Sequence, residues 1–117
     1  MRKQLAVLAI FASAMNPSVA HADAYCAGLT YEALTYSNGD VMILPAWRND
    51  WIVICNLNTP RNGVSTSTCF SWFSAINSSI LYNKSVGYYF AGIEQSACAT
   101  LPTYSGTPAP LYVRLTK

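Results

Sequence analysis

Five short stretches of the chain are rich in β-branched, aromatic and aliphatic residues, and polar or turn-forming residues separate them. This pattern is typical of β-strands. Asn38 and Gly39 lie between the first two stretches and favour a tight hairpin turn, because both residues accept a positive φ. In the first stretch we expect Tyr31 and Ala33 to face inward. The predicted strands are residues 28–36, 41–44, 51–55, 86–90 and 111–115.

The hydrophobic period changes between the third and fourth strands, where apolar residues recur every three or four positions. This spacing indicates one face of an α-helix that covers about residues 68–82. Ser65, Ser67 or Thr68 is expected to supply the N-cap. Serine and β-branched residues are weak helix formers, so the helix must depend on packing of this face against the sheet. The face consists of Cys69, Trp72, Phe73, Ile76 and Ile80.

The predicted fold is mainly β with one helix, in the order β-β-β-α-β-β. Five strands with a helix between the third and fourth is the element order of an OB-fold, a small and partly open Greek-key barrel. Another small α+β sheet with a helix on one face would have the same order. Element order alone therefore leaves both architectures open.

Composition and targeting signals place this fold in an exported protein. The chain has 117 residues, 52% of them hydrophobic and 10% charged, which suits one small domain. Its longest apolar run, Leu5 to Met15, is too short to span a membrane. Two basic residues precede this run and an Ala-His-Ala sequence follows it, which together predict a secretory signal peptide over residues 1–22. We expect residues 23–117 to form the domain and to be exported through the inner membrane, to the periplasm or beyond.

Removal of residues 1–22 changes the charge of the protein. The chain has seven Lys and Arg against five Asp and Glu; without Arg2 and Lys3, 7 − 2 leaves five of each. His21, the only histidine, is lost as well. A neutral domain lacks the excess of Lys and Arg through which proteins bind phosphate backbones, so we expect no nucleic-acid partner.

All four cysteines remain in the predicted domain, at Cys26, Cys55, Cys69 and Cys98. An even number in a small exported chain predicts two disulfides, for which three connectivities are possible. Zinc binding is the alternative, but the domain has no C-x-x-C pair and no histidine, and the cysteine spacings of 29, 14 and 29 match no zinc motif. We therefore expect no metal and no cofactor.

The segment 47–51 is a candidate ligand-binding loop because it places a cation, an amide and an acid between two indoles. Flat rings can cover apolar faces of a ligand while polar side chains fix its orientation. The candidate ligand-binding residues are Trp47, Arg48, Asn49 and Asp50. Alternatively, Trp51 belongs to the core, Trp47 packs over the mouth of the barrel, and Arg48 and Asp50 form a surface ion pair of little energetic value.

Catalysis without histidine would depend on carboxyl groups. Paired carboxylates can hydrolyse glycosides, but the sequence spacing pairs none of these acids, and no nucleophile with a base and an orienting group is evident. We therefore expect no catalytic residue and no enzymatic activity. The candidate acids are Glu32, Asp40, Asp50 and Glu94.

Several segments share their pattern and order with a known family. They are the hairpin turn at 37–40, a strand that ends in Cys55, a turn that ends in Cys69 and opens the helix, and a Val-x-Tyr-Tyr strand at 86–89. On these features residues 28–115 resemble the receptor-binding B subunits of AB5 toxins, particularly that of subtilase cytotoxin. The similarity is one of pattern, without long identity.

The toxin resemblance implies an OB-fold pentamer that binds cell-surface glycans. It also implies disulfides that join Cys55 to Cys69 and Cys26 to Cys98. The toxin subunits have a longer C-terminal region with its own cysteine pair, and their sugar-contacting residues match no motif here, so none is carried over. The C-terminal segment from Cys98 to Val113 resembles small exported proteobacterial proteins whose family name carries no function.

The leading hypothesis is an exported, non-enzymatic module that binds a glycan or a partner protein and forms a homo-oligomer, a pentamer if the toxin resemblance holds. The alternative is a periplasmic structural or accessory protein without a small-molecule ligand. A carboxylate-based glycosidase is the third hypothesis.

Overall fold

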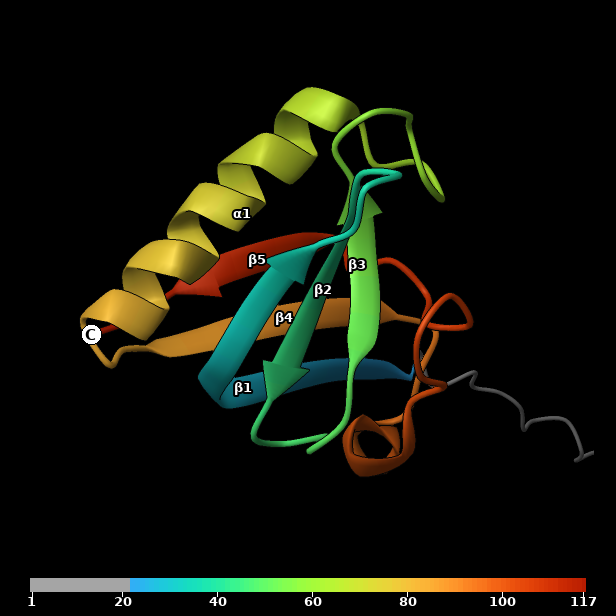
Figure 1. The fold of residues 1–117 in the computed structure, drawn as a ribbon. Coiled ribbons are helices and arrows are strands. Elements are labelled where there is room, and N and C mark those ends of the chain that lie inside the picture. Colours follow the sequence, from blue (N-terminus) through green and yellow to red (C-terminus); the bar gives the residue numbers. More distant parts are fainter. Residues whose placement is uncertain (1–21) are drawn as a thin grey trace, which may run out of the picture.

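Strand β1 runs through both halves of a bent five-stranded sheet in the computed structural model, which describes residues 22–117 (Figure 1). The strand order is β3-β2-β1-β4-β5, and all neighbours are antiparallel. The strands are β1 (Asp23–Thr35), β2 (Asp40–Pro45), β3 (Ile52–Asn56), β4 (Ser85–Ala91) and β5 (Tyr112–Leu115). The predicted signal peptide lies outside the described residues, apart from Ala22.

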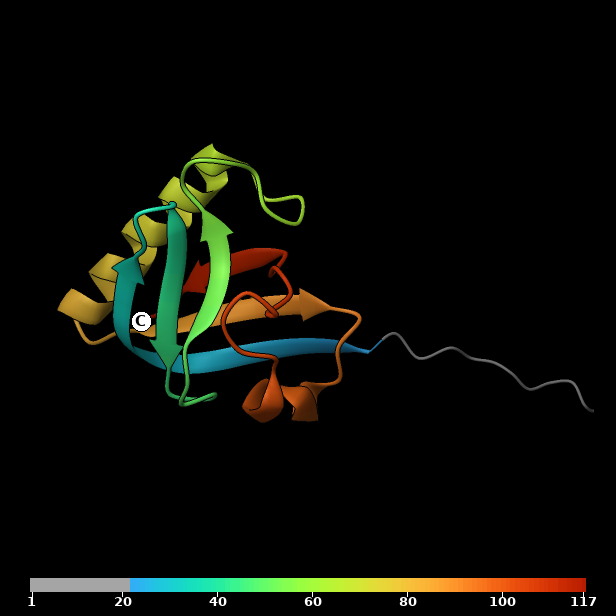
Figure 2. The ribbon, with the colours of Figure 1, turned by 45° about the vertical axis from the view of Figure 1, so that its right-hand side comes forward.

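The sheet bends where β1 changes partners. Asp23 to Leu29 pairs with β4, and the rest of β1 pairs with β2 across a bulge between Thr30 and Glu32. A bulge bends a strand and increases its twist, so the two halves of the sheet curl toward each other (Figure 2). Tyr31 lies in the bulge and is 53% exposed, so the prediction that it faces inward is wrong. Ala33 does pack against the core, as expected.

The curled sheet does not close into a barrel, because no ladder joins β3 to β5 in the described part of the chain. A single parallel bridge between Ile52 and Tyr104 joins the edge of β3 to the β4–β5 connection. Arg61 reinforces this junction by donating from its guanidinium to the carbonyl oxygens of Val53 (3.3 Å) and Thr107 (3.1 Å). The prediction of a mainly β fold with one helix is confirmed, but the predicted barrel is not closed between β3 and β5.

Helix α1 (Thr66–Leu81) contacts β1, β3, β4 and β5, and so packs against both halves of the sheet (Figure 1). Of the three candidate N-caps, Ser65 has this role, since its Oγ accepts a hydrogen bond from the Thr68 N–H. Cys69, Trp72 and Ile76 are buried, so the predicted packing face is confirmed. A further 3₁₀ helix, η1 (Gln95–Thr100), lies between β4 and β5, where the sequence pattern predicts neither a helix nor a strand.

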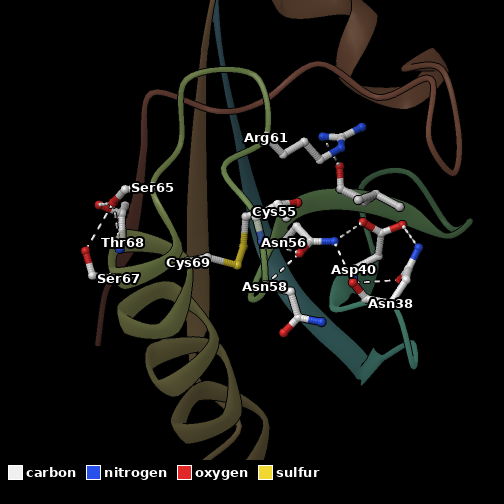
Figure 3. The surroundings of a disulfide bond; sticks show 12 residues. Asn38, Asp40, Cys55, Asn56, Asn58, Arg61, Ser65, Ser67, Thr68 and Cys69 are labelled. Atoms are coloured by element: carbon white, nitrogen blue, oxygen red, sulfur yellow. Dashed lines mark hydrogen bonds between the residues drawn. A yellow bond between two sulfur atoms is a disulfide. The ribbon is translucent and has the colours of Figure 1, made fainter.

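Both disulfides implied by the toxin resemblance are present. Cys55, at the end of β3, is bonded to Cys69 in the first turn of α1 (Figure 3). Cys26 of β1 is bonded to Cys98 of η1, 72 residues further along the chain. No helix within residues 22–117 is long and apolar enough to cross a membrane.

Candidate functional site

The predicted binding loop holds Trp47 against the interior of the sheet. Its ring centroid lies 5.8 Å from that of Tyr88 and 6.3 Å from that of Phe90, and both of these partners are fully buried. The indole Nε1 is buried and has no hydrogen-bond partner among the described residues. Trp47 therefore completes the core at this end of the sheet.

The polar residues of the same loop bond mainly to backbone atoms. Arg48 donates from Nε to the Leu101 carbonyl oxygen (2.8 Å) and so ties the loop to the β4–β5 connection. Asp50 accepts a hydrogen bond from the Trp51 N–H at 2.7 Å. Asn49 has a φ of 57°, and of the four predicted site residues it alone is exposed. These contacts give the loop a defined shape and leave Asn49 as its side chain most open to a ligand.

The four candidate acids lie in different parts of the fold. Glu32 follows the bulge of β1, Asp40 begins β2, Asp50 lies in the β2–β3 connection, and Glu94 precedes η1. Asp40 accepts hydrogen bonds from the amides of Asn38 and Asn56 beside the hairpin turn (Figure 3). Asp40 thus fixes the turn, and no hydrogen bond joins one of these carboxyl groups to another in residues 22–117.

Three tyrosines form a row across the outer face of β1, β4 and β5, and we call this group the tyrosine row. Tyr25 is in register with Tyr89, and Tyr89 is in register with Tyr112. The rings of Tyr89 and Tyr112 are stacked, with centroids 4.9 Å apart and planes 4° from parallel. The Tyr25 ring lies 6.4 Å from that of Tyr112 at an angle of 41°. Tyr112 is 41% exposed and the other two are half-buried, so the row is open to solvent.

The alternation of side chains along β4 separates Tyr88 from Tyr89. Tyr88 points into the core, where its hydroxyl lies 2.6 Å from the Thr30 hydroxyl. Burial raises the pKa of Tyr88, and the hydrogen bond with Thr30 only partly opposes this effect. Tyr89 lies on the opposite face, because successive side chains of a strand point to opposite sides of the sheet.

Gly87 provides the recess in which the Tyr25 ring lies. A Cβ atom at Gly87 would overlap the ring and the hydroxyl of Tyr25. Only glycine leaves this space on β4, so it permits Tyr25 to lie against the sheet. The position of Tyr25 in the row therefore depends on a glycine of the neighbouring strand.

Asp23 fixes Tyr89, the tyrosine on the middle strand of the row. One carboxylate oxygen accepts a hydrogen bond from the Tyr89 hydroxyl, and the other accepts one from the Gly92 N–H (3.1 Å). The hydrogen bond to Asp23 is the main reason why the pKa of Tyr89 is raised. Tyr89 therefore keeps its proton and presents a ring of fixed orientation.

Two open cavities are lined neither by the predicted loop nor by the three tyrosines of the row. One, of about 390 Å³, is at the start of α1 between Ser65, Trp72 and Leu111. The other, of about 490 Å³, is between the bulge of β1 and the end of α1, beside Tyr31 and Leu81. Neither cavity is lined by a group of acids or by a cysteine, and residues 22–117 hold no cluster of three His, Cys, Asp or Glu side chains that could bind a metal.

Sequence reasoning missed the tyrosine row. Tyr25 precedes the predicted start of the first strand at residue 28, whereas β1 begins at Asp23, five residues earlier. Tyr112 lies in the last predicted strand, but nothing in the sequence aligns it with Tyr89. Because side chains alternate along a strand, the adjacent pair Tyr88 and Tyr89 is the one sequence signal for an outward-facing tyrosine.

Comparison of the chain with family models, with curated proteins and with solved structures found no match in any of the three.

Proposed function

We propose that the protein is an exported, non-enzymatic module that binds a glycan at the tyrosine row. The observation that supports this most directly is the row itself: three tyrosine rings in register on three adjacent strands, on an outer face of the sheet. Aromatic residues on an outer face with fixed polar neighbours are typical of ligand sites. Two disulfides and the predicted signal peptide support export.

A carbohydrate fits this surface better than other ligands do. The apolar C–H face of a pyranose ring can pack on a tyrosine ring, while its hydroxyl groups bond to phenol and carboxylate oxygens. The described residues carry five basic and five acidic side chains, which gives no electrostatic attraction for a phosphate backbone. Base stacking on the tyrosines would therefore lack the charge that single-stranded nucleic acids require.

The test is binding of the full-length exported chain to an array of neutral and acidic oligosaccharides, followed by calorimetry with the strongest hit. We expect Tyr112→Ala to weaken that binding by about tenfold or more, because it removes one of the stacked rings. Tyr36→Ala is the matched control: Tyr36 is 51% exposed and lies beside the hairpin turn, outside the row. Equal loss in both variants, or no loss in Tyr112→Ala, would contradict the proposed site.

The predicted loop is tested in the same assay. Asn49→Gly removes the exposed side chain and tolerates the positive φ of this position. We expect binding to be unchanged. Loss of binding in Asn49→Gly with normal binding in Tyr112→Ala would instead place the ligand at residues 47–50.

Two further outcomes address the alternative functions. A chain that binds no oligosaccharide in any arm would favour a structural or accessory role. Release of reducing sugar from the strongest hit, lost when the candidate acids are replaced by amides, would favour the glycosidase hypothesis. The mass of the exported protein in solution tests the predicted pentamer.

A further inference from the structure

The segment that follows β4 is tied to the start of β1 by the side chain of Gln95. Its Nε2 donates to the Tyr25 carbonyl oxygen and its Oε1 accepts from the Tyr25 N–H, both at 2.9 Å. β2 pairs only with the later part of β1, from Thr30 onward, so the edge of β1 at Tyr25 has no strand beside it. The Gln95 amide takes that place and satisfies both backbone groups of Tyr25.

Gln95 is in turn held by the disulfide of η1. Its Nε2 also lies 3.6 Å from the sulfur of Cys98, which is bonded to Cys26, the residue after Tyr25. Cys98 is the only buried residue of η1, so apolar packing does little to keep this helix against β1. Loss of the disulfide would therefore free η1 and, with it, the Gln95 amide.

The same segment reaches the tyrosine row at a second point. Gly92 donates its N–H to Asp23, whose other oxygen holds the Tyr89 hydroxyl. Of the segment between the end of β4 and Cys98, Gln95 thus contacts Tyr25 directly, and Gly92 acts on Tyr89 through Asp23. The other disulfide, Cys55 to Cys69, joins β3 to α1, and β3 lies at the opposite edge of the sheet from β4 and β5.

We propose that the Cys26–Cys98 disulfide controls ligand binding at the tyrosine row, with Gln95 as the residue that positions Tyr25. This inference rests on the proposed function of the row. Reduction by a dithiol adds two electrons and two protons to the disulfide and yields two thiols, while the dithiol becomes a disulfide. Cys98 is 9% exposed whereas Cys55 and Cys69 are fully buried, so the dithiol attacks the Cys26–Cys98 bond first.

The first experiment needs no ligand, because it measures hydrogen exchange of the Tyr25 amide by NMR in the full exported chain. In Cys26→Ser with Cys98→Ser, and in Gln95→Ala, the Tyr25 amide should exchange about tenfold faster or more. Gln95→Glu keeps an acceptor for the Tyr25 N–H and should lie between Gln95→Ala and wild type. Ser96→Ala, on an exposed neighbour in η1, is the control and should leave this rate unchanged.

The second experiment measures binding of the same variants to the strongest oligosaccharide of the array, with and without dithiothreitol. Binding should fall about tenfold or more in Gln95→Ala and in the Cys26 and Cys98 double variant, and persist in Cys55→Ser with Cys69→Ser. Gln95→Ala keeps both disulfides, so it tests the role of Gln95 in binding even if the cysteine variants do not fold.

Two results overturn parts of the proposal separately. An unchanged Tyr25 exchange rate in Gln95→Ala, or unchanged binding after reduction of Cys26–Cys98, overturns the control by the disulfide while leaving the glycan site intact. A wild-type chain that binds no oligosaccharide overturns the proposed function and with it the control of binding, even where the exchange rates confirm that Gln95 positions Tyr25.

Discussion

Neighbouring tyrosines in one strand show how position decides the chemistry of a residue. Tyr88 and Tyr89 have the same side chain, but the strand turns one toward the core and the other toward solvent. The buried hydroxyl requires the Thr30 hydroxyl as its partner, whereas the outer one bonds to the Asp23 carboxylate. The first hydrogen bond serves the stability of the fold, and the second orients a ring of the proposed site.

The substitution Gly87→Ala should disturb the tyrosine row more than the rest of the fold. The added methyl group overlaps the Tyr25 ring, and since the ring is half-buried on the outer face it can move outward. We expect a stability loss of about 1–3 kcal/mol, as for other overpacked sites, and a changed near-UV circular dichroism signal from the tyrosines. Gly106→Ala is the control, because a Cβ there comes no closer than 3.4 Å to its neighbours. Equal effects of both substitutions would contradict the recess.

The buried hydroxyl pair predicts a dependence of stability on alkaline pH. An unfolded tyrosine ionises near pH 10, whereas burial raises the pKa of Tyr88 in the folded state. The unfolded chain then releases a proton that the folded chain keeps, so the free energy of unfolding is at its full value below about pH 10 and falls as the pH rises further. Urea denaturation at about pH 7 and about pH 11 should show a smaller fall in Tyr88→Phe than in wild type.

Tyr88→Phe also leaves the Thr30 hydroxyl buried without its partner, which should cost about 1–3 kcal/mol at neutral pH. Adding Thr30→Val replaces both members by apolar groups of similar shape and should restore part of this loss. A double variant less stable than Tyr88→Phe would contradict a net role for the pair as a satisfied hydrogen bond.

Among the helices and strands, the sequence pattern predicts those features that depend on residues close together in the chain. The Asn-Gly hairpin, the buried run of β3 and the amphipathic face of α1 each follow from neighbours in sequence. The start of β1 was predicted at residue 28 because Asp23 to Ala27 shows no strand signal of its own; this segment is a strand because β4, some sixty residues later in the chain, pairs with it. The 3₁₀ helix η1 was missed for a similar reason, because the disulfide that holds it joins Cys98 to Cys26, 72 residues earlier in the chain.

Helix α1 has no acidic residue in its first turn and no basic residue in its last, so its N-cap should carry much of its local stability. Ser65→Ala removes the acceptor of the Thr68 N–H and should lower the free energy of unfolding by about 1 kcal/mol in urea denaturation. Ser65→Asp keeps an acceptor and adds a favourable charge, so it should be at least as stable as wild type.

Ser71→Ala provides the control for this prediction. Ser71 is exposed in the interior of α1, where alanine is the better helix former, so the variant should gain a few tenths of a kcal/mol. A loss in Ser71→Ala as large as that in Ser65→Ala would show that the cap has no special part in the stability of the helix.

At the scale of the whole molecule, element order predicted the fold class but could not predict the tyrosine row. The row requires the register of three strands, which joins Tyr25, Tyr89 and Tyr112 from distant parts of the chain. A single sequence contains no such register, since each strand can slide by two residues and keep the same face buried. The segment 47–51 is a candidate site in the sequence because its aromatic and polar residues are adjacent, yet in the fold Trp47 packs against the core, and Arg48 and Asp50 form hydrogen bonds with backbone atoms.

The balance of charge over residues 23–117 leads to a prediction for the intact protein. With five basic and five acidic side chains, no net field attracts or repels a ligand, and the tyrosine row offers stacking and hydrogen bonds, which salt screens little. Affinity for an oligosaccharide should therefore change by less than about twofold between about 0.05 and 0.5 M sodium chloride in calorimetry. Binding through six to ten phosphate contacts would instead fall by about a thousandfold or more over a smaller range of salt. A steep dependence on salt would mean that Arg114 on β5, or another charged side chain, contributes more to recognition than the rings do, because only a charge contact is weakened so strongly by counterions.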